Sequence, residues 1–190
     1  MFVLDAKSER IAALLLAALM AATRIHHFGV GTIAPDASTG VFFLAGLLLA
    51  GPVWFVVLSV EAILLDAAAL GLAGVADACM TLGYWTLFAG YGALWYAGRL
   101  ARRMEKLDVL NAGKLICFTA AGTILFFVLS NVGYYFGGGF DQSMGAVEYA
   151  SRVGRYLSPY LVSTLGYVAA GVIAFVAASR VRSGDRVAAR

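Results

Sequence analysis

The chain has 190 residues, of which 62% are hydrophobic and only 13% are charged. A soluble domain of this size would be about 45–50% apolar and about 25% charged, so the composition excludes an ordinary soluble protein and predicts an all-α integral membrane protein. The formal net charge of +3 calls for no nucleic-acid partner, because the basic residues fall at the ends of apolar segments, where membrane topology places them.

Six apolar segments follow one another as candidate transmembrane helices, in a single transmembrane domain over residues 1–190. The second segment is short for a span that normally needs about 20 residues, so it either begins near Ile33 or is buried among its neighbours. No cleavable signal peptide is evident before Arg24, so we expect the first segment to remain a helix. The expected bounds are 11–27, 37–50, 52–70, 80–98, 115–136 and 159–179.

Lysine and arginine are distributed unevenly between the two ends of these segments. They gather at the amino end, after the fourth segment and in the tail, whereas only Arg24, Arg152 and Arg155 of the 14 fall on the other side. By the positive-inside rule, six helices then place both termini in the cytoplasm. Four segments contribute polar residues to the outer side, and this convergence is the main functional clue: His26, His27, Asp66, Asp77, Cys79, Tyr84, Asn131, Tyr134, Tyr135 and Asp141.

Cys79 stands at the start of the fourth segment, two residues after Asp77 and shortly before Tyr84 and Trp85. The other cysteine, Cys117, lies near the cytoplasmic face. A disulfide needs α carbons within about 7 Å, and the membrane core is about 30 Å thick, so we expect Cys79 to be a free thiol. A thiolate suits a soft or borderline metal centre, whereas carboxylates, amides and tyrosines suit the periphery of a large polar ligand. The alternative is a cysteine that only packs in the interior.

Several other features have both a functional and a purely structural interpretation. Neighbouring helical residues point about 100° apart, so His26 and His27 cannot both bind one ion unless the helix has ended. Asp77 is also a candidate cap for the fourth segment. A carboxylate inside the apolar zone is costly, so Glu61 and Asp66 of the third segment should face the bundle interior or a wet cavity.

No motif for ATP hydrolysis, zinc-dependent proteolysis or a serine nucleophile is present, so we expect a transporter without an ATPase part of its own. An enzyme using Cys79 as its nucleophile would need a paired base, and a thiol oxidoreductase would need a second cysteine within reach. The sequence offers neither. A purely structural partner of a larger complex remains a further alternative.

Four stretches resemble the BtuM family of bacterial cobalamin transporters, which are related to the S-components of energy-coupling factor (ECF) transporters. The resemblance covers nearly the whole chain, in order and with the six-helix layout. It is carried by residues 24–28 (RIHHF), 35–38 (PDAS) with 41–46 (VFFLAG), 77–79 (DAC) and 130–133 (SNVG).

This resemblance implies an S-component-like bundle in the bacterial inner membrane that takes up cobalamin or a related corrinoid through a periplasm-facing pocket. Cobalamin would be the transported ligand, and no intrinsic cofactor is expected. The family's cysteine maps onto Cys79, whose thiolate would coordinate the cobalt and, by exchanging an axial ligand, could remove cyanide from cyanocobalamin. The other expected ligand contacts are Asp66, Asp77, Tyr84, Trp85, Asn131, Tyr135 and His27.

The first segment carries alanine at every fourth position, at Ala13, Ala17 and Ala21. Such a smooth stripe favours close helix packing, although an alanine-rich helix also produces one by composition alone. In S-components an Ala-x-x-x-Ala pattern docks the coupling subunit of an ECF energising module. Because some BtuM proteins are solitary, the resemblance implies either such a partner or none.

The main alternative function is a nickel or cobalt ion transporter that uses His26, His27, Asp66 and Cys79. This alternative predicts saturable binding of the bare ions and no corrinoid spectrum.

Overall fold

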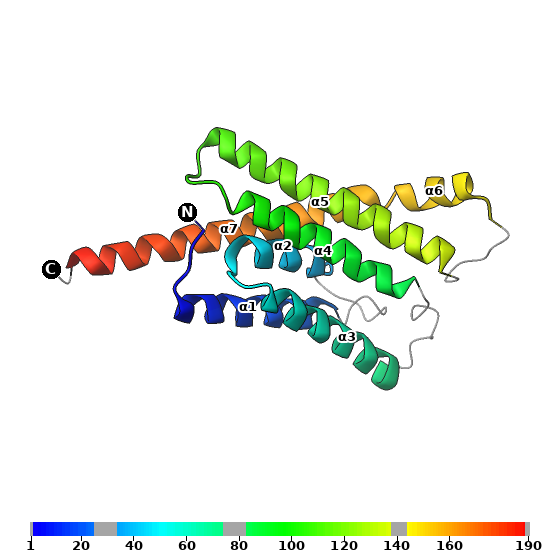
Figure 1. Ribbon diagram of the computed structural model, residues 1–190, viewed down its shortest axis with the longest axis horizontal. Coiled ribbons are helices and arrows are strands. Elements are labelled where there is room, and N and C mark those ends of the chain that lie inside the picture. The colour runs from blue at the N-terminus through cyan, green and yellow to red at the C-terminus, as the bar shows by residue number, and fades with distance from the viewer. Residues whose placement is uncertain (1, 25–33, 74–82, 138–143, 189–190) are drawn as a thin grey trace.

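The computed structural model describes residues 2–24, 34–73, 83–137 and 144–188. All regular structure in these ranges is helical, which confirms the predicted all-α class (Figure 1). The helices are α1 (Ala6–Arg24), α2 (Ser38–Leu48), α3 (Val53–Ala73), α4 (Tyr84–Ala101), α5 (Val109–Phe136), α6 (Ala146–Gly154) and α7 (Leu157–Ala188).

Three of these helices are long and apolar enough to cross a membrane, over Val53–Gly71, Val109–Phe136 and Leu157–Val181. The protein is therefore of a membrane-embedded type. The helix α1 has 19 residues but carries charged residues in its first turns, and α4 has 18 residues. The prediction of six spans with both ends in the cytoplasm thus goes beyond these three helices and stays a prediction.

The short helix α2 is the centre of the bundle. All 11 of its residues are buried, which resolves the question of the short second segment in favour of burial among its neighbours. Glycines allow α2 and α4 to approach closely: a Cβ on Gly46 would meet the main chain of Trp95, and one on Gly98 would meet that of Phe43. Close backbone approach of this kind depends on small residues at the contact.

Several helices differ from their expected bounds, and one helix was not expected. The fifth segment was expected from Leu115, but α5 begins at Val109 because Asp108 caps it by accepting a hydrogen bond from the Asn111 N–H. The fourth was expected from Met80, and its described helix begins at Tyr84. The helix α6 was not expected at all; it is nine residues long, amphipathic, and buries only Tyr149.

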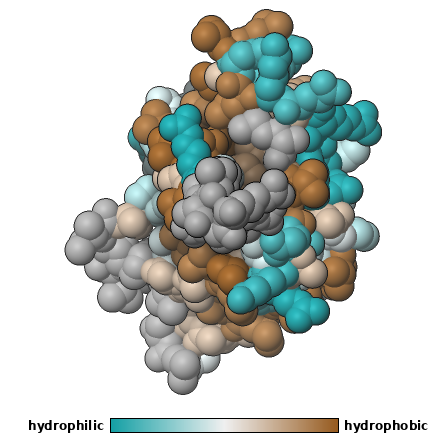
Figure 2. All heavy atoms as spheres, turned by 90° about the vertical axis from the view of Figure 1, so that its left-hand side faces the viewer, coloured by the Kyte–Doolittle hydropathy of each residue, from teal (hydrophilic) through white to brown (hydrophobic). Residues whose placement is uncertain are grey.

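The two ends of the bundle differ in character. Both chain ends and the connection from α4 to α5 lie at one end, which we call the basic end (left in Figure 1). Figure 2 looks onto this end, where hydrophilic residues gather along the upper and right-hand side of the view. Exposed basic residues here include Lys7, Arg10, Arg103, Lys106, Lys114 and Arg180. The helices α1, α3 and α5 end at the opposite end, where α2, α4 and α7 begin.

Candidate functional site

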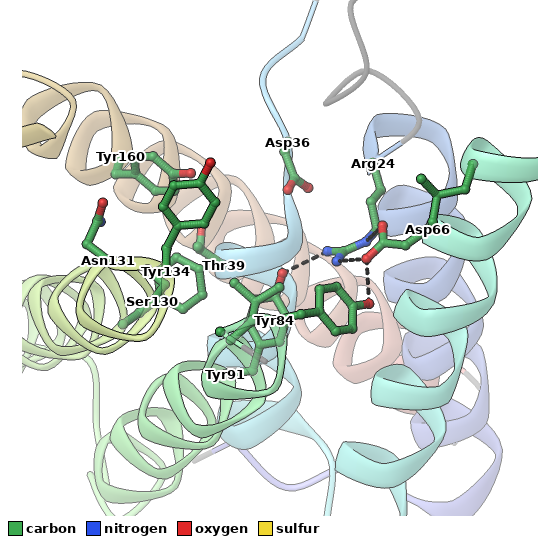
Figure 3. A pocket seen from close by; sticks show the side chains of 14 residues that line it. Arg24, Asp36, Thr39, Asp66, Tyr84, Tyr91, Ser130, Asn131, Tyr134 and Tyr160 are labelled. Atoms are coloured by element: carbon green, nitrogen blue, oxygen red, sulfur yellow. Dashed lines mark hydrogen bonds and ion pairs between the residues drawn. The ribbon is translucent and has the colours of Figure 1, made fainter. Parts of the chain in front are cut away.

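A cavity of about 320 Å³ lies at the end of the bundle opposite the basic end. Because three helices end here and three begin here, side chains far apart in the sequence line the same space (Figure 3). Its polar lining comes from six helices and from Asp36 just before α2: Arg24, Asp36, Thr39, Asp66, Tyr84, Tyr91, Ser130, Asn131, Tyr134 and Tyr160.

One wall of the cavity is built around a buried ion pair between α1 and α3. The Nε of Arg24 donates to Oδ1 of Asp66 at 2.8 Å, and its Nη2 donates to Oδ2 at 2.7 Å. Only 4% of Arg24 and 6% of Asp66 are exposed. This two-point geometry matches the planar guanidinium to the carboxylate, and the pairing offsets the large cost of removing both charges from water.

Hydroxyl groups extend this ion pair into a network. The Nη1 of Arg24 donates to Ser38 Oγ at 2.8 Å and to Tyr91 Oη at 2.7 Å, and Tyr84 Oη donates to Asp66 Oδ2 at 2.7 Å. Ser38 Oγ in turn donates to Asp36 Oδ1 at 2.6 Å. The network therefore joins α1, α2, α3 and α4 at the cavity.

The prediction that Asp66 faces the bundle interior is confirmed, and Tyr84 lies beside it. Both carboxylate oxygens of Asp66 already accept hydrogen bonds, from Arg24 and from Tyr84. Arg24 was counted only among the topology charges and Tyr91 was not among the expected ligand contacts, so neither was predicted as a cavity residue. A signal existed for Arg24, which lies three residues before the expected end of its segment, close to the level of Asp66, four residues before the end of its own. Tyr91 lies in the middle of the fourth segment and carried no such signal.

The opposite wall is formed by α5 (Figure 3). Asn131 lines the cavity, as expected, and its Nδ2 donates to the main-chain oxygen of Phe127 at 2.8 Å. Its Oδ1 accepts a hydrogen bond from Tyr149 Oη at 3.0 Å. Burial raises the pKa of Tyr149 above its ordinary 10.0, so its hydroxyl stays a hydrogen-bond donor beyond the usual pH range of a tyrosine. The unexpected helix α6 is thus attached to the cavity wall through Tyr149.

Two expected ligand contacts do not line the cavity. Trp85 is 62% exposed and makes ring contacts with Tyr84 and Phe88. Tyr135 packs its ring against that of Tyr149 at 5.0 Å between centroids, and its hydroxyl donates to the main-chain oxygen of Met144. The structure brings together Asp66, Tyr84 and Asn131 from the predicted set, and places Trp85 and Tyr135 outside their cavity.

The predictions for His26, His27, Asp77 and Cys79 fall in residues 25–33 and 74–82, which lie outside the described residues. Both ranges adjoin residues that line the cavity, since one follows Arg24 and the other precedes Gly83. Among the residues that are described, no group of three or more histidine, cysteine, aspartate or glutamate side chains could hold a metal ion. Cys117 is an exposed free cysteine.

The alanine stripe of α1 faces this chain's own helices more than its surroundings. Ala13 is 4% exposed and belongs to the core, Ala17 packs against the core, and Ala21 is half-buried. The exposed face of α1 instead carries larger side chains, namely Ile11, Leu14 and Leu15. The small residues therefore serve close packing within the bundle, and docking of a partner on this stripe stays a prediction.

The arrangement provides hydrogen-bond donors and acceptors on two facing walls, with tyrosine rings between them, which is typical of a site for a polar small molecule. Compared with models of known protein families the chain matches none, and no curated protein sequence matches it either.

Proposed function

We propose that the protein takes up cobalamin or related corrinoids across a bacterial inner membrane. The observation that carries this proposal is the polar cavity at the end of the bundle opposite the basic end. Because basic residues favour the cytoplasmic side, that cavity opens outward, where an incoming vitamin is captured. The resemblance of residues around the cavity to the BtuM family supplies the identity of the ligand.

The chemistry of the lining supports a ligand with many amide groups, such as a corrinoid. Asn131 and Tyr84 can exchange hydrogen bonds with amide side chains, and Asp36 adds a carboxylate acceptor. Tyr134 and Tyr160 supply flat aromatic surfaces for the ring. A cavity of about 320 Å³ holds only part of so large a molecule. The remainder of the ligand lies outside this cavity, on the side of Arg24 and Gly83.

In this proposal Cys79 coordinates the cobalt of the corrin through its thiolate. A thiolate competes well for an exchangeable axial position on cobalt, so binding of cyanocobalamin displaces cyanide as an incidental reaction. The cobalt belongs to the transported ligand, and the protein acts as a transporter rather than an enzyme. Energy comes either from an ECF module or, in a solitary protein, from no dedicated partner.

The test is the visible absorption spectrum of detergent-purified protein after incubation with cyanocobalamin and removal of the free ligand. We expect the wild type to retain corrin with a shifted spectrum, and Cys79→Ala to lose the ligand or the shift. Cys117→Ala is the matched control, because this exposed cysteine lies on α5 away from the cavity lining, and its spectrum should equal the wild type.

Each other outcome has a defined meaning. Colourless wild-type protein would overturn corrinoid binding, and saturable uptake of nickel or cobalt ions by that protein would establish the metal-ion alternative. Coloured protein with the same spectrum in wild type and Cys79→Ala would keep the transporter and remove Cys79 as the cobalt ligand. An unchanged cyanide-bound spectrum in the wild type would overturn the exchange step alone.

A further inference from the structure

A second hollow lies at the basic end and shares no residue with the polar cavity. It is an apolar groove of about 950 Å³ between α1 and α7, and Leu44 and Leu48 of α2 form its floor. The proposed function makes no use of this groove. Its lining is almost entirely hydrocarbon, so a polar nutrient is not its ligand.

The length of the groove corresponds to one leaflet of a bilayer. Its lining on α1 reaches from Lys7 to Leu19, and on α7 from Tyr167 to Val181. At about 1.5 Å per residue, the wall on α1 is roughly 18 Å long and the wall on α7 roughly 21 Å. One leaflet is about 15 Å thick in its hydrocarbon part and about 20–22 Å thick with its headgroups. The groove therefore extends from the membrane surface at the basic end to about the middle of the membrane.

The side chains on the two walls of the groove differ in size, and the small ones on α7 leave the space between the helices open. On α7 the small residues Ala170, Ala174 and Ala178 recur at every fourth position and are exposed. On α1 the larger side chains of Ile11 and Leu15 are 49% and 65% exposed. The helix α7 rests on the α2 floor through Gly171, where an added Cβ would come within 2.5 Å of the Leu44 side chain.

A cation stands at the surface end of the groove. Lys7 belongs to the lining and is exposed. The carboxylate of Asp5, also in the lining, accepts a hydrogen bond from the Ser8 N–H at 2.8 Å and so caps the first turn of α1. The groove thus combines an apolar trough of one-leaflet length with a lysine at the level of the lipid headgroups. An anionic phospholipid has the complementary form: an acyl chain below and a phosphate above.

We propose that this groove binds an anionic phospholipid of the leaflet at the basic end, with one acyl chain along the trough and the headgroup phosphate against Lys7. A transmembrane helix of a partner would extend through both leaflets, about 30 Å, whereas the groove covers one. The lipid site does not depend on corrinoid uptake, so an experiment can reject either proposal without rejecting the other.

The test is native mass spectrometry of the detergent-purified full chain, titrated with phosphatidylglycerol or with phosphatidylcholine of the same acyl chains. A lysine near the membrane surface contributes about 1 kcal/mol to binding of an anionic lipid, which is about fivefold in affinity. We expect phosphatidylglycerol to bind about fivefold more tightly, and Lys7→Gln to abolish that preference. Arg10→Gln is the matched control, since Arg10 is exposed near Lys7 but outside the lining, and it should keep the preference.

A second pair of variants tests the trough itself. Ala174→Phe places a ring in the groove and should lower the affinity for both lipids at least tenfold, whereas Ala18→Phe, on an exposed position of α1 outside the lining, should leave it unchanged. Three results would each overturn the proposal. The wild type could bind the two lipids with equal affinity, Lys7→Gln and Arg10→Gln could change the preference equally, or Ala174→Phe could leave the lipid affinity unchanged. If Ala174→Phe instead removed a second protein chain from the complex, the occupant would be a helix.

Discussion

Arginine side chains occur at both ends of the bundle, but their charges are stabilised in different ways. At the cavity, Arg24 is buried and pairs with Asp66 through two hydrogen bonds. At the basic end, Arg99 and Arg102 are partly exposed and donate to main-chain oxygens, with Leu49 O accepting from both. A buried guanidinium needs a partner charge, whereas one in contact with solvent needs only the free carbonyls of a helix end.

The central helix α2 connects these two situations. Its first residue, Ser38, belongs to the buried network, while the carbonyls of Leu49 and Ala50, just after its last turn, accept hydrogen bonds from Arg99 of α4. Negative charge near a helix N-terminus and positive charge near its C-terminus both complement the helix dipole. With Asp36 before α2 and Arg99 after it, a short helix unable to span the membrane is held at both ends. At the cavity end the buried charges need every hydrogen-bonding partner of the network, whereas solvent can replace a lost partner at the basic end.

The largest effect is expected from breaking the buried pair. Arg24→Met leaves the Asp66 carboxylate uncompensated, and Asp66→Leu leaves the Arg24 guanidinium uncompensated, so each should lower the free energy of unfolding by about 3–5 kcal/mol. The double variant removes both charges and should lose less than the sum of the two. Thermal unfolding in one detergent measures all four proteins, and additive losses would show that the two side chains are not energetically coupled.

A smaller effect is expected at the other end of α2. Arg102→Gln should lower the free energy of unfolding by about 1 kcal/mol, because Arg99 still donates to Leu49 O and solvent reaches this site. Changing both arginines should cost more than the sum of the single changes, since Leu49 O then loses both donors. The matched control is Arg103→Gln, an exposed neighbour that should stay within about 0.5 kcal/mol of the wild type. A control loss as large as that of Arg102→Gln would assign the effect to net charge.

The sequence was sufficient to predict the membrane character, the helical class and the inward position of Asp66. These predictions succeed because each rests on a large free-energy cost: exposing apolar segments to water, or a carboxylate to lipid. The convergence of Asp66, Tyr84 and Asn131 also follows from the alternation of helix directions, which places the ends of odd segments beside the starts of even ones.

The partners within the site could not be predicted in the same way. Arg24 and Asp66 are 42 residues apart, and no local pattern says which charge a buried carboxylate meets. Tyr84 and Trp85 are neighbours that point about 100° apart, so the orientation of α4 decides which of them faces the cavity. The helix α6 was not predicted because its nine residues are too few to span a membrane. Its contact with the cavity wall depends on one side chain, Tyr149.

The smallest effect is expected at Asp108, a partly exposed cap at the basic end. Its carboxylate accepts the Asn111 N–H at 2.9 Å and lies 3.1 Å from Lys106 Nζ, and these contacts lower the pKa of Asp108 below its ordinary 3.8. A lowered carboxylate pKa contributes stability that is complete above about pH 3.8 and is lost as the pH falls through the folded-state value. Asp108→Ala should therefore lower the Tm slightly at pH 7, by less than Arg102→Gln does, and the gap from wild type should close on acidification below pH 4. A gap that persists in acid would mean that Asp108 stabilises α5 by packing rather than by charge, and the basic end would then resemble the cavity end more than its exposure suggests.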